Sequence, residues 1–338
     1  MRFLIVGAGG IGAYYGARLL AAGHAVVFVA RGEHLDALRG KGLSVRHPEF
    51  SFEAAVDALD QAVLVNNLNA DAFDLIILTI KAGATDEVMS SLHPWLAIAD
   101  TPLLSLQNGV DNEIIIESRV GSERTVGGLA VRIGGHIIRP GVIEATGAAQ
   151  VVMGAWRSAA DNPRLQHELE RFVACFNAAS IPTTLSEDIQ KALWRKLLIN
   201  NGVNPLSALT GLDTRRLTAH PVLTRTVYQL MEETARAAKA DDVSLDAADI
   251  DEMYRLICQF DAIKTSMLVD REKGRPLELD AICGTVVKRC RRLGIEAPVT
   301  ELIQGLLESR VSADLDNARA CEQDVDGLLM NNVFHNYQ

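Results

Sequence analysis

The chain has 338 residues, a formal net charge of −10 and a hydrophobic fraction of 48%. This length exceeds what one compact core usually holds, so we expect two domains. The acidic balance argues against a nucleic-acid-binding surface and against an anionic membrane surface, because both require clustered positive charge. Small molecules are therefore the expected partners.

Cysteine usage and hydropathy favour a cytoplasmic location. The five cysteines are scattered, odd in number and without a Cys-x-x-Cys pair, which is typical of thiols in a reducing compartment rather than of disulfides or a metal site. The apolar run after Arg2 ends at Gly7, too early for a signal peptide. No stretch approaches the length of a membrane span.

The chain opens with a short apolar segment, residues 3–6, a glycine-rich turn and a helical pattern over residues 13–22. The turn has the G-x-G-x-x-G spacing, in which the glycines permit a tight turn, a close phosphate approach and close helix–strand packing. The helix N-terminus then offers free N–H groups to an anion. We predict a dinucleotide pyrophosphate site at Gly7, Ala8, Gly9, Gly10, Ile11 and Gly12. A glycine-rich turn without a ligand is the alternative.

The end of the second predicted strand indicates which dinucleotide binds. A carboxylate there would accept hydrogen bonds from the ribose 2′-OH of NAD, but the sequence has Ala30 followed by Arg31. A guanidinium pairs with phosphate, so the sequence favours NADP over NAD. The alternatives are a solvated Arg31 and a ribose bound by Glu33.

Up to about residue 155, short β-rich segments alternate with helical patterns, which predicts parallel strands joined by crossovers. The predicted strands are residues 3–6, 25–30, 43–46, 75–80, 103–106 and 125–131. Residues 140–147 and 149–154 are expected to add antiparallel strands that close the sheet edge. A helix over residues 161–179 follows, and then an extended segment over 181–185.

Two predicted strands end in polar residues. Lys81 follows the strand over 75–80, and Asn108 follows the strand over 103–106. Ligands of open α/β sheets bind beyond the carboxyl ends of the strands, so both side chains should face the crevice of the glycine turn. The alternatives are a solvated lysine and an ordinary Asn108-Gly109 turn.

From Ser186 onward the pattern is nearly continuous helix. Ser186 is a plausible N-cap, because Glu187 and Asp188 would then lie in the first turn. The sequence therefore predicts a Rossmann-type, doubly wound α/β domain over residues 1–186 and an all-α domain over residues 187–330.

Lys196, Asn200 and Asn204 are spaced four residues apart. A persistent helix places them on one stripe beside Leu197, at the border of the buried face. Unpaired polar groups are costly to bury, so these side chains should line a polar cleft. The alternative is a lysine whose stem covers apolar surface, with asparagines that end the helix near Gly202.

A later segment contains Ser266, Asp270 and Glu278, and is interrupted by a Gly274-Arg275-Pro276 break between two helices. Glu278 lies near the start of the second helix, where a carboxylate is also favoured by the helix dipole. Its spacing does not distinguish a site residue from a capping residue.

Taken together, these segments resemble the ketopantoate reductase (2-dehydropantoate 2-reductase) family over nearly the full length of the chain. The resemblance rests on residues 7–12, Arg31, Ile80-Lys81-Ala82, Gln107-Asn108-Gly109, Leu193-Trp194-Arg195-Lys196, Asn200, Asn204-Pro205-Leu206, Ser266-Met267-Leu268, Asp270 and Glu278-Leu279-Asp280. It implies an NADP-binding Rossmann domain joined to a helical domain of the 6-phosphogluconate dehydrogenase C-terminal type.

The resemblance also implies a role for each site residue. Lys196 would donate a proton to the C2 oxygen of the substrate while NADPH delivers hydride, and Glu278 would hold Lys196 or a substrate hydroxyl. The remaining implied roles are nicotinamide and substrate contact for Asn108, substrate binding for Asn200, Asn204 and Ser266, and cofactor charge for Lys81 and Arg31.

The expected reaction is the NADPH-dependent reduction of 2-dehydropantoate to (R)-pantoate in pantothenate synthesis. The chain departs from the family pattern at Glu144-Ala145-Thr146 and around Asp213-Thr214, so reduction of another 2-oxo acid is the near alternative. A non-catalytic NADPH sensor is the distant one, because fold alone does not establish activity. Apolar helix faces in the second domain are compatible with a homodimer.

Overall fold

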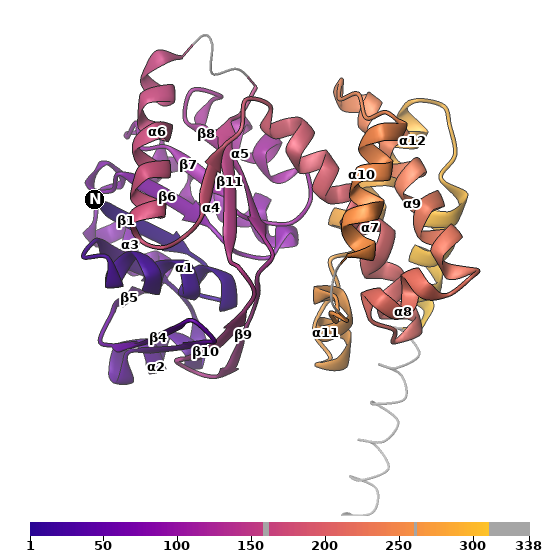
Figure 1. Cartoon of the computed structure of the whole chain (residues 1–338). Coiled ribbons are helices and arrows are strands. Elements are labelled where there is room, and N and C mark those ends of the chain that lie inside the picture. Colours follow the sequence, from indigo (N-terminus) through magenta and orange to yellow (C-terminus); the bar gives the residue numbers. More distant parts are fainter. Residues whose placement is uncertain (158–161, 260–261, 311–338) are drawn as a thin grey trace, which may run out of the picture.

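The computed structural model describes residues 1–157, 162–259 and 262–310, which form an α/β domain and a helical domain (Figure 1). Residue 161 of the helix predicted over residues 161–179 and residues 311–330 of the predicted second domain lie outside these ranges. The two-domain fold class predicted from the sequence is confirmed. The limits of the two domains stay a prediction.

An eight-stranded sheet lies at the centre of the first domain, with the order β12-β11-β8-β7-β6-β1-β2-β5. Adjacent strands are parallel except for β8 and β11. The strands are β1 (Arg2–Val6), β2 (Ala25–Val29), β5 (Asp57–Leu59), β6 (Leu75–Leu78), β7 (Leu103–Ser105), β8 (Thr125–Val131), β11 (Gln150–Ala155) and β12 (Thr183–Leu185). The segment predicted over 149–154 is therefore antiparallel to β8 as expected, although β12 and not β11 forms the edge.

Both faces of this sheet are covered, because its strands are apolar on both sides. Phe3 and Ile5 of β1 belong to one core, and Leu4 and Val6 to the other. The Phe3 side is packed by α1 (Gly10–Ala21), α2 (Gly32–Lys41) and α6 (Pro163–Ala178), and the Leu4 side by α3 (Gln61–Asn67), α4 (Thr85–Leu96) and α5 (Asn112–Val120). Short 3₁₀ turns, η1 (Ala70–Ala72) and η2 (Ala82–Ala84), lie before β6 and α4.

Two predicted strands belong to a different sheet from the one expected. Residues 43–46 and 140–147 correspond to β3 (Leu43–His47) and β10 (Val142–Thr146), which join β4 (Phe50–Ala54) and β9 (Gly134–Arg139) in a second sheet of order β4-β3-β10-β9. The prediction that they extend the main sheet is wrong. Leu43 and Val45 are buried, as an apolar strand of either sheet is expected to be, and the choice of sheet depends on the parallel pairing of β3 with β10, far along the chain.

The helix that leaves the first domain starts later than predicted. It is α7 (Ile189–Thr210), and its N-cap is Asp188, whose carboxylate accepts a hydrogen bond from the Lys191 N–H. Ser186 is not the cap, because its N–H donates to the Met153 oxygen and keeps this segment extended beside β11. The helix continues through Gly202 to Thr210, so the predicted polar stripe lies on one continuous helix.

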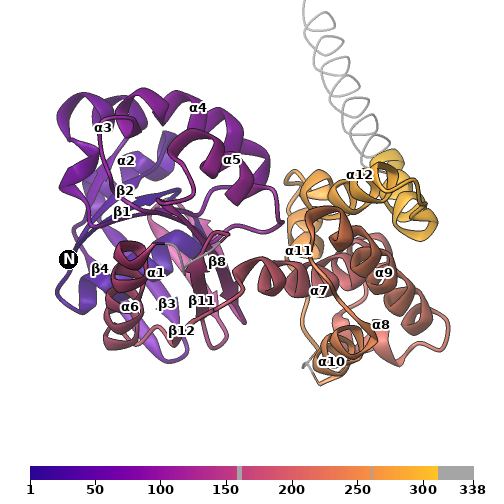
Figure 2. The same cartoon turned by 90° about the horizontal axis from the view of Figure 1, so that it is seen from above.

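The second domain is built around α7, which leads into it from the sheet domain (Figure 2). Its other elements are α8 (Thr214–Ala219), α9 (Leu223–Ala238), η3 (Lys239–Asp241), α10 (Ala247–Cys258), α11 (Ser266–Glu272), the π-helical turn η4 (Asp280–Gly284) and α12 (Thr285–Arg292). Residues 298–310 are also helical. Among the residues that the structure describes, no helix is both long and apolar enough to span a membrane.

Candidate active site

The glycine turn after β1 has the shape that a close ligand approach requires. Gly7 has a φ of +106°, and a Cβ on Gly12 would lie 2.3 Å from the Gly7 oxygen and from Thr79 Oγ1. A Cβ on Gly9 would meet no atom within 4 Å. The first and third glycines are thus required by the fold, whereas the second faces open space.

The start of α1 leaves backbone donors beside this open space. The first hydrogen bond of the helix runs from the Ala13 N–H to the Gly9 oxygen. The N–H groups of Gly10, Ile11 and Gly12 have no acceptor among the described residues, as expected for the first turn of a helix. These groups can bind an anion.

The other backbone groups of the turn are held in place by the protein. The Ala8 N–H donates to the Val29 oxygen, and the Ala8 oxygen lies 2.7 Å from His34 Nε2. His34 Nδ1 accepts a hydrogen bond from the Gly141 N–H. His34 therefore connects the glycine turn to the β9–β10 turn, a link that the sequence pattern did not indicate.

Arg31 lies two residues after the end of β2, at the N-cap position of α2. Its side chain is exposed and makes no hydrogen bond or ion pair within the part of the chain that the structure describes. Glu33 is also exposed, in the first turn of the same helix. Arg31, predicted to bind the 2′-phosphate, and Glu33, its alternative for the ribose, thus both lie beyond the carboxyl end of β2.

Residues from both domains meet beyond the carboxyl ends of β6 and β7. Glu278 accepts hydrogen bonds from Lys81 Nζ at 3.4 Å, from Asn108 Nδ2 at 3.2 Å and from the Ala82 N–H at 3.2 Å. Lys81 Nζ also lies 2.7 Å from the carboxylate of Asp270. Glu278 therefore contacts the sheet domain and does not cap its own helix.

Burial alone would lower the pKa of Lys81, but the carboxylates of Glu278 and Asp270 act against it, and the pKa is raised. The lysine is therefore charged in this arrangement. Asp270 also pairs with Arg275 at 2.8 Å. The spacing of Asp270 along the chain indicates no role for it, because its partner Lys81 lies in the other domain.

Lys196 lies half-buried on α7, and its Nζ donates to the backbone oxygen of Ala130 in β8 at 2.9 Å. Burial lowers the pKa of Lys196 to about 8, while the carboxylates of Glu278 and Glu113 oppose this shift. Its ammonium therefore releases a proton more readily than an ordinary lysine does.

The predicted substrate residues differ in their surroundings. Asn204 is only 6% exposed, yet neither its amide nor that of Asn200 forms a hydrogen bond within the described residues. Ser266 is exposed at the start of α11, where Thr265 is the N-cap. The two amides on α7 and the hydroxyl on α11 thus remain available to a ligand.

Glu113 is a buried acidic residue that sequence reasoning missed. Its side chain is 0% exposed, and neither carboxylate oxygen has a hydrogen-bond partner in the described structure. In the sequence it looks like an ordinary acidic residue in the first turn of α5, so no local signal marks it. Within the described ranges, no group of three or more His, Cys, Asp or Glu side chains is placed to hold a metal ion.

A parallel sheet of the nucleotide-binding type, a glycine turn and a cluster of polar side chains from the sheet domain and a helical domain define a two-domain dehydrogenase-like protein. The family model "Ketopantoate reductase PanE/ApbA" matches residues 3–158, and its C-terminal counterpart matches residues 188–311. The chain belongs to the ketopantoate reductase family of oxidoreductases.

Individual relatives cover almost all of the chain. A 2-dehydropantoate 2-reductase of Pyrococcus abyssi is 27% identical over 311 residues, which are 92% of this chain and 98% of the relative. The crystal structure of 2-dehydropantoate 2-reductase from Geobacter metallireducens GS-15 is 30% identical, with a TM-score of 0.80 and coverage of 92% of this chain and 100% of the other. The ternary structure of D-mandelate dehydrogenase with NADH and anilino(oxo)acetate shares the fold, at 21% identity, a TM-score of 0.83 and coverage of 93% and 99%.

Proposed function

We propose that the protein reduces 2-dehydropantoate to (R)-pantoate with NADPH. The observation that carries this proposal is Lys196, an ammonium whose lowered pKa is partly opposed by the carboxylate of Glu278, which accepts hydrogen bonds from Lys81 and Asn108. The relatives named 2-dehydropantoate 2-reductase support the choice of substrate. In this proposal residues 1–186 bind the cofactor, and residues 187–330 contribute most of the substrate contacts.

The glycine turn fits a dinucleotide. The open space at Gly9 and the unpaired N–H groups of Gly10, Ile11 and Gly12 would hold the pyrophosphate. The exposed guanidinium of Arg31 would hold the 2′-phosphate of NADP, and a bound reduced nicotinamide supplies the hydride.

The residues of the chain supply the proton and the orientation. Negative charge develops on the C2 oxygen as the ketone is reduced, so an ammonium there stabilises this charge and donates the proton, an effect typically worth ~10²- to 10⁴-fold in rate. We assign this role to Lys196. Glu278 would orient Asn108 and the substrate.

The remaining polar groups would bind the substrate itself. The amides of Asn200 and Asn204 and the hydroxyl of Ser266 would bind its carboxylate and distal hydroxyl. A buried amide without an internal partner is costly, and a bound ligand would satisfy it.

Two alternative functions can be distinguished from the proposed one by a single experiment. One is the same chemistry on another 2-oxo acid, since the fold is shared with a D-mandelate dehydrogenase. The other is an NADPH sensor without catalysis.

We also propose that the enzyme is cytoplasmic, and that it forms a homodimer through exposed apolar residues of the second domain, such as Leu302 and Leu306.

The test is the steady-state oxidation of NADPH with ketopantoate and a panel of other 2-oxo acids, repeated with NADH. The proposal predicts the highest kcat/KM for ketopantoate with NADPH. A much higher value for another oxo acid would retain the reaction and replace the substrate. Tight NADPH binding without turnover of any oxo acid would favour the sensor.

A further inference from the structure

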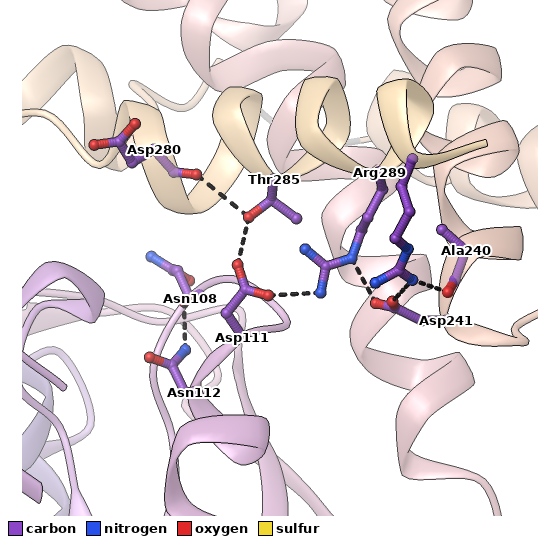
Figure 3. Close-up of polar contacts among 9 residues, drawn as sticks. Asn108, Asp111, Asn112, Ala240, Asp241, Asp280, Thr285 and Arg289 are labelled. Carbon is purple, nitrogen blue, oxygen red and sulfur yellow. Dashed lines mark hydrogen bonds and ion pairs between the residues drawn. The ribbon is translucent and has the colours of Figure 1, made fainter. Parts of the chain in front are cut away.

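The loop after β7 carries Asn108 and is bound to the helical domain a few residues later. Asp111, at the N-cap position of α5, accepts a hydrogen bond from Thr285 Oγ1 at 2.8 Å. The other oxygen of Asp111 lies 2.5 Å from Arg289 Nη2 (Figure 3). One carboxylate of the sheet domain thus holds two successive turns of α12.

Arg289 is a fixed partner for this carboxylate. Its side chain is 8% exposed, and its Nε donates to Asp241 at 2.5 Å (Figure 3). Its guanidinium also lies over the ring of Trp194. Asp241 in turn pairs with Arg292. Trp194 belongs to α7, two residues before Lys196. The guanidinium that binds Asp111 is therefore packed against the helix that carries the proposed proton donor.

The position of Asp111 is transmitted to Asn108 through the next residue. Asn112 Nδ2 donates to the backbone oxygen of Asn108 at 2.8 Å, and Asn112 Oδ1 accepts from Thr85 Oγ1 at 2.8 Å. Asn112 is 2% exposed. Its amide therefore closes the turn from Asn108 to the start of α5 and leaves little freedom between Asn108 and Asp111.

The same turn is packed closely against the helical domain. Gly109 has a φ of +96°, and a Cβ there would lie 3.1 Å from the backbone oxygen of Ala281. On the other side of Gly109, Asn108 donates to Glu278. The turn meets the helical domain at η4 and α12, and among the described residues its contact is a charged pair only at Asp111.

We propose that Asp111 and Arg289 form an interdomain latch that positions Asn108 opposite Lys196 and Glu278. Both are positioning residues in this proposal, because they act on the reaction through Asn108 and not through a contact of their own with the substrate or the cofactor. The inference rests on the proposed reductase function for its kinetic consequence, but the latch itself can be measured without a substrate. It goes beyond the glycine turn and the cleft, since it assigns a role to a pair outside both.

The test variant is Asp111→Ala, with Asp111→Asn as a milder change that keeps an acceptor for Thr285. The matched control is Asp86→Ala, which removes an exposed partner of Arg119 on α5 without affecting the interdomain contact. Hydrogen–deuterium exchange over residues 108–113 reports the latch, and kinetics report the positioning. Thermal unfolding shows that each variant is folded, and Asp111→Asn serves if Asp111→Ala is not.

We expect faster exchange over residues 108–113 in Asp111→Ala and unchanged exchange in Asp86→Ala. The kcat for the oxo acid should fall by about tenfold or more, because misplacement of an orienting group by about 1 Å costs up to ~10²-fold. The Kd for NADPH should rise much less than kcat falls, since Asn108 is only one of the proposed cofactor contacts and the glycine turn and Arg31 lie apart from the latch. Asp111→Asn should fall between the wild type and Asp111→Ala.

Unchanged exchange would overturn the latch. Faster exchange with unchanged kcat would overturn the positioning role. Equal losses of kcat and NADPH affinity would also overturn it, because they would indicate a general structural defect. If the wild type reduces no 2-oxo acid, the proposed function fails, and the exchange experiment alone decides the latch.

Discussion

The Nζ atom of Lys196 lies 2.9 Å from the backbone oxygen of Ala130, so α7 of the helical domain is bonded directly to β8 of the sheet. This bond holds the proposed proton donor at the domain junction. It also restricts the rotamers of this long side chain before a ligand binds. The entropic cost of ordering the side chain on binding is therefore smaller.

Lys196→Ala is expected to reduce kcat by ~10²-fold or more, because the general acid and its positive charge are both lost. NADPH affinity should stay near that of the wild type. The measurement is single-turnover oxidation of NADPH together with a fluorescence titration of the cofactor. A kcat within twofold of the wild type would remove Lys196 from the mechanism.

The pH dependence of the wild type follows from the same residue. The pKa of Lys196 is lowered to about 8, and reduction needs the charged, protonated form. The kcat/KM for the oxo acid should therefore be constant below this pKa and fall as the pH rises through it. A profile without a fall up to about pH 10, the ordinary lysine range, would contradict this assignment.

Glu278→Gln is expected to shift this fall in kcat/KM to lower pH. The carboxylate of Glu278 raises the pKa of Lys196, so a neutral amide allows burial to lower that pKa further. The glutamine keeps the size of the side chain and one acceptor oxygen, which can serve either Asn108 or the Ala82 N–H, whereas the carboxylate uses a separate oxygen for each. The comparison is the kcat/KM profile of Glu278→Gln with that of the wild type.

The matched control for Glu278→Gln is Glu272→Gln, which alters an exposed partner of Lys264 in the same domain. Its profile should coincide with that of the wild type. A profile of Glu278→Gln that also coincides with the wild type would show that the two groups are not coupled.

Arg31→Ala is expected to reduce the preference for NADPH over NADH by about ten- to a hundredfold. A charge-assisted hydrogen bond to phosphate is worth about 1.5–3 kcal/mol, and Arg31 has no competing partner in the described structure. The ratio of the two kcat/KM values is the measurement. Arg39→Ala is the control, since Arg39 lies on the same helix but bonds to Ala58 and Asp60. An equal loss with both cofactors would contradict a 2′-phosphate contact.

The sequence patterns predicted those helices and strands that depend only on residues close together in the chain. The strand before Gly7, the helix after Gly9 and the strand before Arg31 follow from apolar runs and glycine positions close in sequence. The same patterns could not assign the segment at Leu43 to its sheet, because that depends on pairing with Val142. The cap at Asp188 was missed because Ser186 is held extended by Met153, a contact made only in the folded chain.

The candidate site also depends on contacts between residues that are distant in the sequence. The structure brings Lys81, Asn108 and Glu278 together, whereas the sequence pattern placed only Lys81 and Asn108 at neighbouring strand ends, and the family resemblance gave Glu278 a contact with Lys196 or with a substrate hydroxyl. It also adds Asp270 to Lys81, and Arg289 to Asp111. Both added contacts cross between domains, so no spacing along the chain can indicate them.

Glu113 provides a prediction about stability instead of turnover. Burial raises the pKa of Glu113 to about 7 from its ordinary value of 4.5, and the charge of Lys196 only partly opposes the shift. Ser105 and the Gly128 N–H also lower this pKa, although no hydrogen bond of normal geometry reaches either carboxylate oxygen. A buried carboxylate with no full partner is costly in its charged form.

The pKa of Glu113 is higher in the folded protein than in the unfolded chain. Between about pH 4.5 and about pH 7 the native protein therefore holds a proton that the unfolded chain has lost. The unfolding free energy should therefore fall as the pH rises from about 4.5 to about 7, and the cost of the charged carboxylate is complete only above that range. The shift corresponds to about 3 kcal/mol.

Glu113→Gln removes this titration. Relative to the wild type, the variant should gain unfolding free energy as the pH is raised from about 4.5 to about 8, by up to about 3 kcal/mol. The amide has its own burial cost, but that cost does not depend on pH, so the slope and not the offset is diagnostic. Urea unfolding at a series of pH values measures it, with the exposed Glu87→Gln as the control whose difference from the wild type stays flat. A difference in unfolding free energy between Glu113→Gln and the wild type that also stays flat with pH would contradict the prediction. It would mean that the carboxylate of Glu113 is already charged in the native state at low pH, and that Lys196 compensates for its burial.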